Sequence, residues 1–207
     1  MERPVVVVSN RGPLTFRRDE TGALVARRGA GGLVSGLGPL VAGTDALWVA
    51  AAMTDADRAA AAAGVVDAEG MHVRLLAVDP EAYRLAYDVV SNQVLWFVYH
   101  GLWDLPREPS FGADLRDAWH AYRLVNEAFA DTVAETAPHG AVVLVQDYHL
   151  SLLGRSLAER RPDLAAVHFS HTPFATPTWL RVLPEHIAGE LLAGLAAHRA
   201  CGFHTRG

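Results

Sequence analysis

The stretch VVLVQDYHL, residues 142–150, is apolar for four residues and then brings Gln146, Asp147, Tyr148 and His149 in succession. A short β-branched run of this kind is typical of a strand that is buried on both faces, as in a parallel sheet covered by helices. A turn needs Gly, Asn or Asp, but it has no use for an acid, a phenol and an imidazole together. If other strands end in the same way, their polar ends mark one functional edge of a sheet.

Two more predicted strands end in polar side chains. VVVVSNRGP, residues 5–13, ends in Ser9, Asn10 and Arg11, and AVHFSHTPF, residues 166–174, ends in Ser170, His171 and Thr172. Taken singly, each has a structural explanation: Asn10 and Arg11 can cap a turn, Asp147 can cap the next helix, and His171 can bond a nearby loop. The carboxyl ends of parallel strands share one edge, outside which ligands bind, so the three ends together favour a binding site.

The alternation of short apolar runs with helical periodicity predicts the fold class. Strands are predicted at residues 4–9, 46–51, 71–78, 141–146, 165–170 and 200–204. Helices are predicted at 56–63, 112–135, 149–160, and from Pro184 as first helical residue to His198. This order predicts an α/β protein with a doubly wound, Rossmann-like, mainly parallel sheet. Residues 15–28 are predicted to form a hairpin or flexible loop that turns at 20–22.

Composition excludes several classes of function. With 207 residues and a formal charge of −5, the chain lacks the basic surface that non-specific nucleic-acid binding needs. Its one cysteine, Cys201, cannot form an internal disulfide, which favours a reducing, cytoplasmic location. No apolar run approaches the ~20 residues of a membrane span. The histidines show no metal-ligand spacing, so we expect no metal.

The glycine cluster GAGGLVSGLG, residues 29–38, has the composition of a phosphate-binding loop that opens a helix. It begins 20 residues after the first predicted strand ends, which counts against a nicotinamide-binding Rossmann domain. No Gly-Lys-Ser/Thr follows, so it is not a P-loop. Close packing of a glycine-rich helix start explains the cluster equally well.

Aromatic and polar side chains alternate in residues 86–101, AYDVVSNQVLWFVYHG. The cluster contains Tyr87, Asn92, Trp96, Tyr99 and His100. Aromatic faces with polar tips suit a sugar ring, whose C–H faces stack while its hydroxyls need partners. Alternatively, Trp96 and Tyr99 are ordinary core residues of a helix.

These segments, in this order, resemble the N-terminal half of the trehalose-6-phosphate synthase family, retaining glycosyltransferases with the two-domain GT-B fold. The resemblance rests on SNR, GAGGLVSGL, YDVVSNQVLW, QDYHLSLLG, HTPF and the terminal GFHT, and it extends over nearly the whole chain. It implies transfer of glucose from UDP- or GDP-glucose to glucose 6-phosphate, with no cofactor and no covalent protein intermediate. Positioning and electrostatic stabilisation of the leaving diphosphate would then carry the catalysis.

The resemblance also implies roles for residues on the acceptor side. Arg11 matches the arginine that grips the phosphate of glucose 6-phosphate, for which a guanidinium fork is well shaped. Tyr87 and Trp96 match the acceptor-binding tyrosine and tryptophan. Asp147 matches the carboxylate that holds the acceptor hydroxyls.

On the donor side, Gly31 and Gly32 match the glycines whose backbone approaches the diphosphate. His171 matches the active-site histidine near the transferred glucose. Asp147 and His171 are therefore the expected catalytic residues, with Asp147 binding the acceptor and not attacking as a nucleophile.

Three departures from the family pattern leave alternatives open. Gln146 replaces a histidine, Ala51 replaces a tryptophan, and HTPFA replaces the commoner HIPFP. Similar drift occurs in pseudo-glycosyltransferases, which couple cyclitols, and a non-catalytic regulatory or binding module of the same fold is a further alternative.

Residues 1–207 are expected to be an incomplete N-terminal acceptor-binding domain, with the C-terminal nucleotide-sugar domain absent from this chain. The chain alone is then expected to turn over little or no nucleotide sugar. A homo-oligomer is compatible with the sequence, and the donor base is not readable from it.

Overall fold

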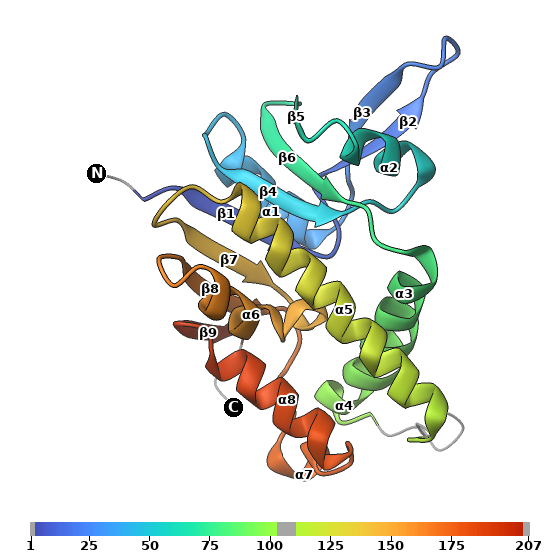
Figure 1. Cartoon of the computed structure of the whole chain (residues 1–207), viewed down its shortest axis with the longest axis vertical. Coiled ribbons are helices and arrows are strands. Elements are labelled where there is room, and N and C mark those ends of the chain that lie inside the picture. Colours follow the sequence, from blue (N-terminus) through green and yellow to red (C-terminus); the bar gives the residue numbers. More distant parts are fainter. Residues whose placement is uncertain (1–2, 103–110, 205–207) are drawn as a thin grey trace.

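The computed structural model describes residues 3–102 and 111–204. Its centre is a seven-stranded sheet in the order β5-β6-β4-β1-β7-β8-β9 (Figure 1). Every neighbouring pair is parallel except the antiparallel pair β5–β6. The strands are β1 (Val5–Ser9), β4 (Leu47–Ala51), β5 (Val65–Ala68), β6 (Met71–Leu76), β7 (Val142–Gln146), β8 (Ala165–Ser170) and β9 (Ala200–Phe203). The predicted mainly parallel α/β sheet is confirmed.

One strand, β5, was not predicted. It has four residues, none of them fully buried, and it pairs with β6 at the edge of the sheet. Its sequence VVDA is too short and too polar to show a clear period of two.

Helices cover both faces of the sheet because successive strand residues point to opposite sides. Val6 and Val8 pack on one face against the largest core cluster, which includes α5 and α8. Val7 packs on the other face, against the β2–β3 hairpin, α1 and α2. The helices are α1 (Gly32–Val41), α2 (Asp55–Ala61), α3 (Pro80–Arg84), η1 (Leu85–Leu95, a π-helix), α4 (Trp96–His100), α5 (Ala113–Thr136), η3 (Tyr148–Leu150, a 3₁₀-helix), α6 (Leu153–Arg160), α7 (Pro177–Leu180) and α8 (Glu185–Ala196). In the described ranges, no helix is long and apolar enough to cross a membrane.

The predicted hairpin is confirmed as an antiparallel pair, β2 (Leu14–Arg18) and β3 (Leu24–Arg28). It is anchored, not flexible, at its base: Leu14 and Phe16 are buried, and the backbone N–H of Phe16 donates to the Asp57 carboxylate at 2.7 Å. At the turn, the Asp19 carboxylate accepts from the backbone N–H of Thr21 at 2.8 Å.

The predicted helix at 149–160 is interrupted in the structure. The chain forms the short η3 first, and α6 begins only at Leu153. Two side chains of α5 hold the backbone between them: Tyr122 Oη accepts from Ser151 N at 3.3 Å, and Asn126 Oδ1 accepts from Leu152 N at 3.1 Å. Helical periodicity within the segment could not reveal these distant partners.

The first residue of α8 was predicted one position too early. Pro184 is the residue before the helix, with an extended backbone (φ −51°, ψ 139°), and α8 begins at Glu185. The 24-residue α5 closely matches its predicted range.

The order of the strands places a crevice beside β1. From β1 the chain builds outward to β4 and β6 on one side, and it then returns to add β7 on the other side. In an open α/β sheet, ligands bind outside the carboxyl ends at such a switch point. Ser9 and Gln146, the last residues of β1 and β7, are paired in register there.

Candidate functional site

Asp147 follows β7 at the switch point with a strained backbone. Its φ of 72° and ψ of 164° lie in a region that only glycine adopts readily, at a cost of roughly 1–3 kcal/mol for other residues. Its Oδ1 accepts from the backbone N–H of Tyr148 at 2.9 Å and from that of His171 at 3.3 Å. Asp147 therefore does cap η3, as the structural explanation proposed, and it does so with a backbone conformation that is costly for a residue other than glycine.

The turn after β1 is held rigid by side chains. Ser9 Oγ donates to the Arg11 carbonyl at 2.7 Å and accepts from the Trp48 indole at 2.7 Å. Asn10 Oδ1 accepts from the Tyr83 hydroxyl at 3.1 Å. The backbone that carries Arg11 is thus fixed, while the Arg11 side chain is exposed.

The Arg11 guanidinium is available for an anion. Its Cζ lies 5.6 Å from the centre of the Tyr87 ring, a cation–π contact. Within residues 3–102 and 111–204, no carboxylate forms an ion pair with it. A guanidinium with a fixed backbone and no acidic partner is well suited to bind phosphate.

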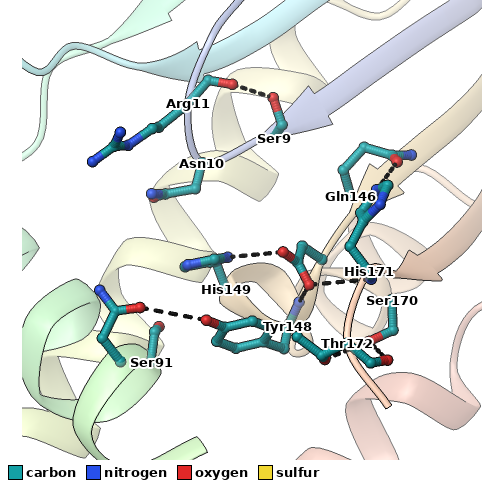
Figure 2. A network of polar contacts seen from close by, with 12 residues as sticks. Ser9, Asn10, Arg11, Ser91, Gln146, Tyr148, His149, Ser170, His171 and Thr172 are labelled. Carbon is teal, nitrogen blue, oxygen red and sulfur yellow. Dashed lines mark hydrogen bonds and ion pairs between the residues drawn. The ribbon is translucent and has the colours of Figure 1, made fainter. Parts of the chain in front are cut away.

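A stack of aromatic rings joins the ends of β1 and β7. Tyr83 stacks on Tyr87 at 5.7 Å, Tyr87 on His149 at 5.3 Å, and His149 on Tyr148 at 4.3 Å between ring centres. Figure 2 shows the His149 side chain extending from the segment that follows Gln146 toward the turn that carries Asn10 and Arg11. We call the stacked rings of Tyr83, Tyr87, His149 and Tyr148 the aromatic wall. The structure thus brings the predicted residues Arg11, Tyr87 and Asp147 together at this wall.

His149 completes this wall as a neutral ring. Its pKa is lowered to about 4, mainly because the ring is buried; the Asp147 carboxylate opposes this effect and the nearby Arg11 charge adds to it. Its Nδ1 lies 3.8 Å from Asp147 Oδ2. Sequence analysis noted His149 at the strand end but gave it no role, and its place in the polar run after β7 was the only signal.

His171 lies beside Asp147 at the end of β8 and faces Gln146. Its Nε2 is 3.0 Å from Gln146 Oε1, so the residue that replaces the family histidine orients this imidazole (Figure 2). The ring edge also contacts Phe169 and His204, with centres 5.0 and 5.5 Å apart. Burial lowers the pKa of His171, partly against the pull of Asp147.

The glycine cluster separates into a packed part and an open part. A Cβ on Gly29 would lie 2.9 Å from the Gly12 carbonyl, so close packing explains that glycine. Gly31 has φ 129° and caps α1 without a side-chain hydrogen bond, and a Cβ on Gly31 or Gly32 would meet nothing within 4 Å. Because Gly29 N also donates to the Pro13 carbonyl at 2.7 Å, the open start of α1 is tied to the turn that carries Arg11.

Trp96 is not part of the ring stack. Its indole contacts Phe97 and His100, with ring centres 5.0 and 4.2 Å apart, on α4 beyond η1. Tyr99 is 3% exposed and packs its edge on Tyr148, as expected for the core alternative. In the part of the chain that the structure describes, no three His, Cys, Asp or Glu residues are grouped as a metal site would require.

Comparisons with known proteins agree on one family. Residues 3–207 match the model described as glycosyltransferase family 20. Trehalose-6-phosphate synthases of Mycolicibacterium vanbaalenii and Mycobacterium tuberculosis are 36% and 34% identical over 98% of this chain, which spans 40% of their length.

Solved structures agree with the sequence comparison. An E. coli protein bound with UDP-2-fluoro glucose is 25% identical, with a TM-score of 0.75. A UDP-forming α,α-trehalose-phosphate synthase from Burkholderia vietnamiensis is 27% identical, also with a TM-score of 0.75. Each alignment covers 98% of this chain and 40% of the solved chain.

Proposed function

The chain belongs to glycosyltransferase family 20, and from this membership we propose that it is the acceptor-binding domain of a trehalose-6-phosphate synthase. Its acceptor is glucose 6-phosphate, and the sugar donor of the complete enzyme is UDP- or GDP-glucose. The observation that carries the proposal is the meeting, at the switch point, of an unpaired guanidinium and a strained carboxylate on one aromatic wall.

Each end of the acceptor finds a suitable group on this wall. Arg11 binds the phosphate through a charge-assisted, two-pronged hydrogen bond. Asp147 Oδ2, which is free of the backbone bonds that occupy Oδ1, accepts from sugar hydroxyls. The Tyr87 ring is stacked by Tyr83 and His149 and contacted by Arg11, so it offers the acceptor its phenol hydroxyl and not a free ring face.

The donor half of the site is only begun in this chain. The open first turn of α1 at Gly31 and Gly32 offers backbone N–H groups to a diphosphate, and His171 stands near the glucose that is transferred. The chain spans about 40% of its relatives, so we propose that a second, nucleotide-sugar domain completes this site. In the complete enzyme an acceptor hydroxyl bonds to the anomeric carbon, the bond to the diphosphate breaks, and the diphosphate takes the hydroxyl proton.

Binding of glucose 6-phosphate and glucose to the purified chain, measured by calorimetry, tests the acceptor assignment. Arg11→Ala should weaken glucose 6-phosphate binding by about 10- to 100-fold, because it removes a charge-assisted bond, and it should leave glucose binding unchanged. Arg199→Ala is the matched control, because Arg199 is exposed and lies at the amino end of the edge strand β9, whereas Arg11 follows the carboxyl end of the central strand β1.

Equal affinity of the unmodified chain for glucose and glucose 6-phosphate would contradict the proposal. Tighter binding of a cyclitol phosphate than of glucose 6-phosphate would favour the pseudo-glycosyltransferase alternative. Binding of neither, together with co-purification of a full-length synthase, would favour a regulatory module.

A further inference from the structure

The π-helix η1 has a geometry that changes which residues share a face. Over Leu85–Leu95 its backbone bonds join residues five apart, as where Trp96 N donates to the Ser91 carbonyl; the Ser91 hydroxyl also donates to the Ala86 carbonyl, at 2.9 Å. Residues five apart would be about 140° apart around an α-helix, but they are neighbours on successive turns of a π-helix. π-Helices are rare and are frequently found at functional sites.

Tyr87 and Asn92 are five residues apart on this helix, and both reach the segment that follows β7. The Tyr87 ring stacks on His149, and Asn92 Oδ1 accepts from the Tyr148 hydroxyl at 3.4 Å (dashed line at Tyr148 in Figure 2). In an α-helix the two side chains would diverge by about 140°, whereas the π-helix brings them toward adjacent residues of the same segment. The π-helix η1 therefore places Asn92 next to the aromatic wall, of which Tyr87 is part.

Within the described residues, only the oxygen of the Asn92 side-chain amide takes part in a hydrogen bond. Its oxygen faces Tyr148, and among the described residues no group accepts a hydrogen bond from its Nδ2. The side chain is half-buried, so Nδ2 is a donor that a ligand can reach. The hydrogen bond from Tyr148 is long, at 3.4 Å, so it orients the Asn92 amide toward the site without fixing its position.

A donor at this position complements the other groups of the site. The ionised Asp147 carboxylate only accepts hydrogen bonds, and Arg11 serves the phosphate. A sugar hydroxyl both donates and accepts, so a pocket that reads hydroxyls needs a neutral donor beside the carboxylate. The wall contains such a donor in Asn92 Nδ2.

We propose that Asn92 is a further acceptor-binding residue, whose amide nitrogen donates to one hydroxyl of the sugar and so selects for that hydroxyl. The inference rests on the proposed function, because it takes glucose 6-phosphate as the ligand. The π-helix is then the device that presents Tyr87 and Asn92 together, and Tyr148 is the positioning residue that orients the amide.

The competing explanation is that Asn92 only holds Tyr148 in place, and three variants separate the two roles. Asn92→Ala removes both ends of the amide. Asn92→Asp keeps an acceptor for Tyr148 but removes the donor. Gln93→Ala is the control, because Gln93 is the exposed neighbour on the same helix.

The experiment measures calorimetric affinities of the full chain for glucose 6-phosphate and for its 2-, 3- and 4-deoxy analogues. Asn92→Ala and Asn92→Asp should each weaken glucose 6-phosphate binding by about tenfold, as expected for one lost hydrogen bond, and Gln93→Ala should not. For one analogue, the unmodified chain and Asn92→Ala should bind equally well, because the hydroxyl that Asn92 recognises is already missing.

Two results would overturn the inference alone: equal weakening of all analogues by Asn92→Ala, or normal glucose 6-phosphate binding by Asn92→Asp. If the unmodified chain does not bind glucose 6-phosphate at all, the proposed function fails, and the role of Asn92 in reading that sugar fails with it.

Discussion

Histidines lie in two regions of this molecule, partly buried in one and fully buried in the other, and burial lowers the pKa in both. At the switch point the pKa of His149 falls to about 4, and between β8 and α8 that of His168 falls to about 3. The surroundings differ. His149 is stacked on Tyr87 and Tyr148, and the charges of Asp147 and Arg11 act on its pKa in opposite directions. His168 is 1% exposed and faces His198, with ring centres 5.2 Å apart.

The difference shows that a lowered histidine pKa reports burial and not function. No carboxylate is paired with His168 or His198 in the described residues, and His168 Nδ1 and His198 Nε2 are buried without a hydrogen-bond partner. The candidate site is distinguished by other features: charges of opposite sign, Asp147 and Arg11, near the ring, and a strained backbone at Asp147. We therefore assign His149 to the site and the His168–His198 pair to the core.

The largest expected effect is that of Asp147→Gly on acceptor binding. Loss of the carboxylate should weaken glucose 6-phosphate binding by about 100-fold, at the upper end for a charged hydrogen-bonding group. Stability should change by less than about 1 kcal/mol, because glycine relieves the backbone strain but loses the cap on η3. Calorimetry gives the first quantity and urea unfolding gives the second.

Asp147→Ala is the informative partner of this variant. It removes the same carboxylate but keeps the strain, so it should be less stable than Asp147→Gly by about 1 kcal/mol and bind equally poorly. Normal glucose 6-phosphate binding by either variant would contradict the assignment of the acceptor site to the switch point.

The core pair should contribute to the pH dependence of the free energy of unfolding. The folded pKa of His168 lies below the unfolded value of about 6.5, so protonation favours the unfolded state. Its contribution is complete above pH 6.5 and is lost as the pH falls toward 3, at about 1.4 kcal/mol per pH unit. His168→Leu should therefore reduce the loss of stability between pH 7.5 and pH 5 by about 2 kcal/mol.

Urea unfolding at both pH values measures this change, with the exposed His186→Ala as the control. Leucine is of similar size and leaves no unpaired nitrogen, so the variant is expected to fold. An unchanged pH dependence in His168→Leu would mean that His168 is already charged or solvated in the folded protein.

The sheet and its polar edge could be predicted from sequence because both depend on local patterns. Runs such as residues 142–146 are apolar throughout, and the parallel topology then places Arg11 and Asp147 at one edge. The aromatic stack could not be predicted, since Tyr83, Tyr87 and His149 meet only through the tertiary fold. The π-helix was missed because residues 85–95 show no period that separates it from an α-helix, and the interruption before α6 depends on Tyr122 and Asn126 of a distant helix.

The smallest expected effect comes from exchanging one imidazole for a ring of similar shape. His149→Phe keeps the stacks on Tyr87 and Tyr148, and the 3.8 Å separation from Asp147 is too long for a hydrogen bond, so stability should change by less than about 1 kcal/mol. It removes the ring nitrogens beside the acceptor, so glucose 6-phosphate binding should weaken by about fivefold. His168→Phe is the matched exchange in the core: a larger ring in a fully buried position should cost roughly 1–3 kcal/mol without affecting binding. If calorimetry and urea unfolding gave the reverse, with binding lost in His168→Phe and stability lost in His149→Phe, the two regions would have to exchange the roles assigned to them.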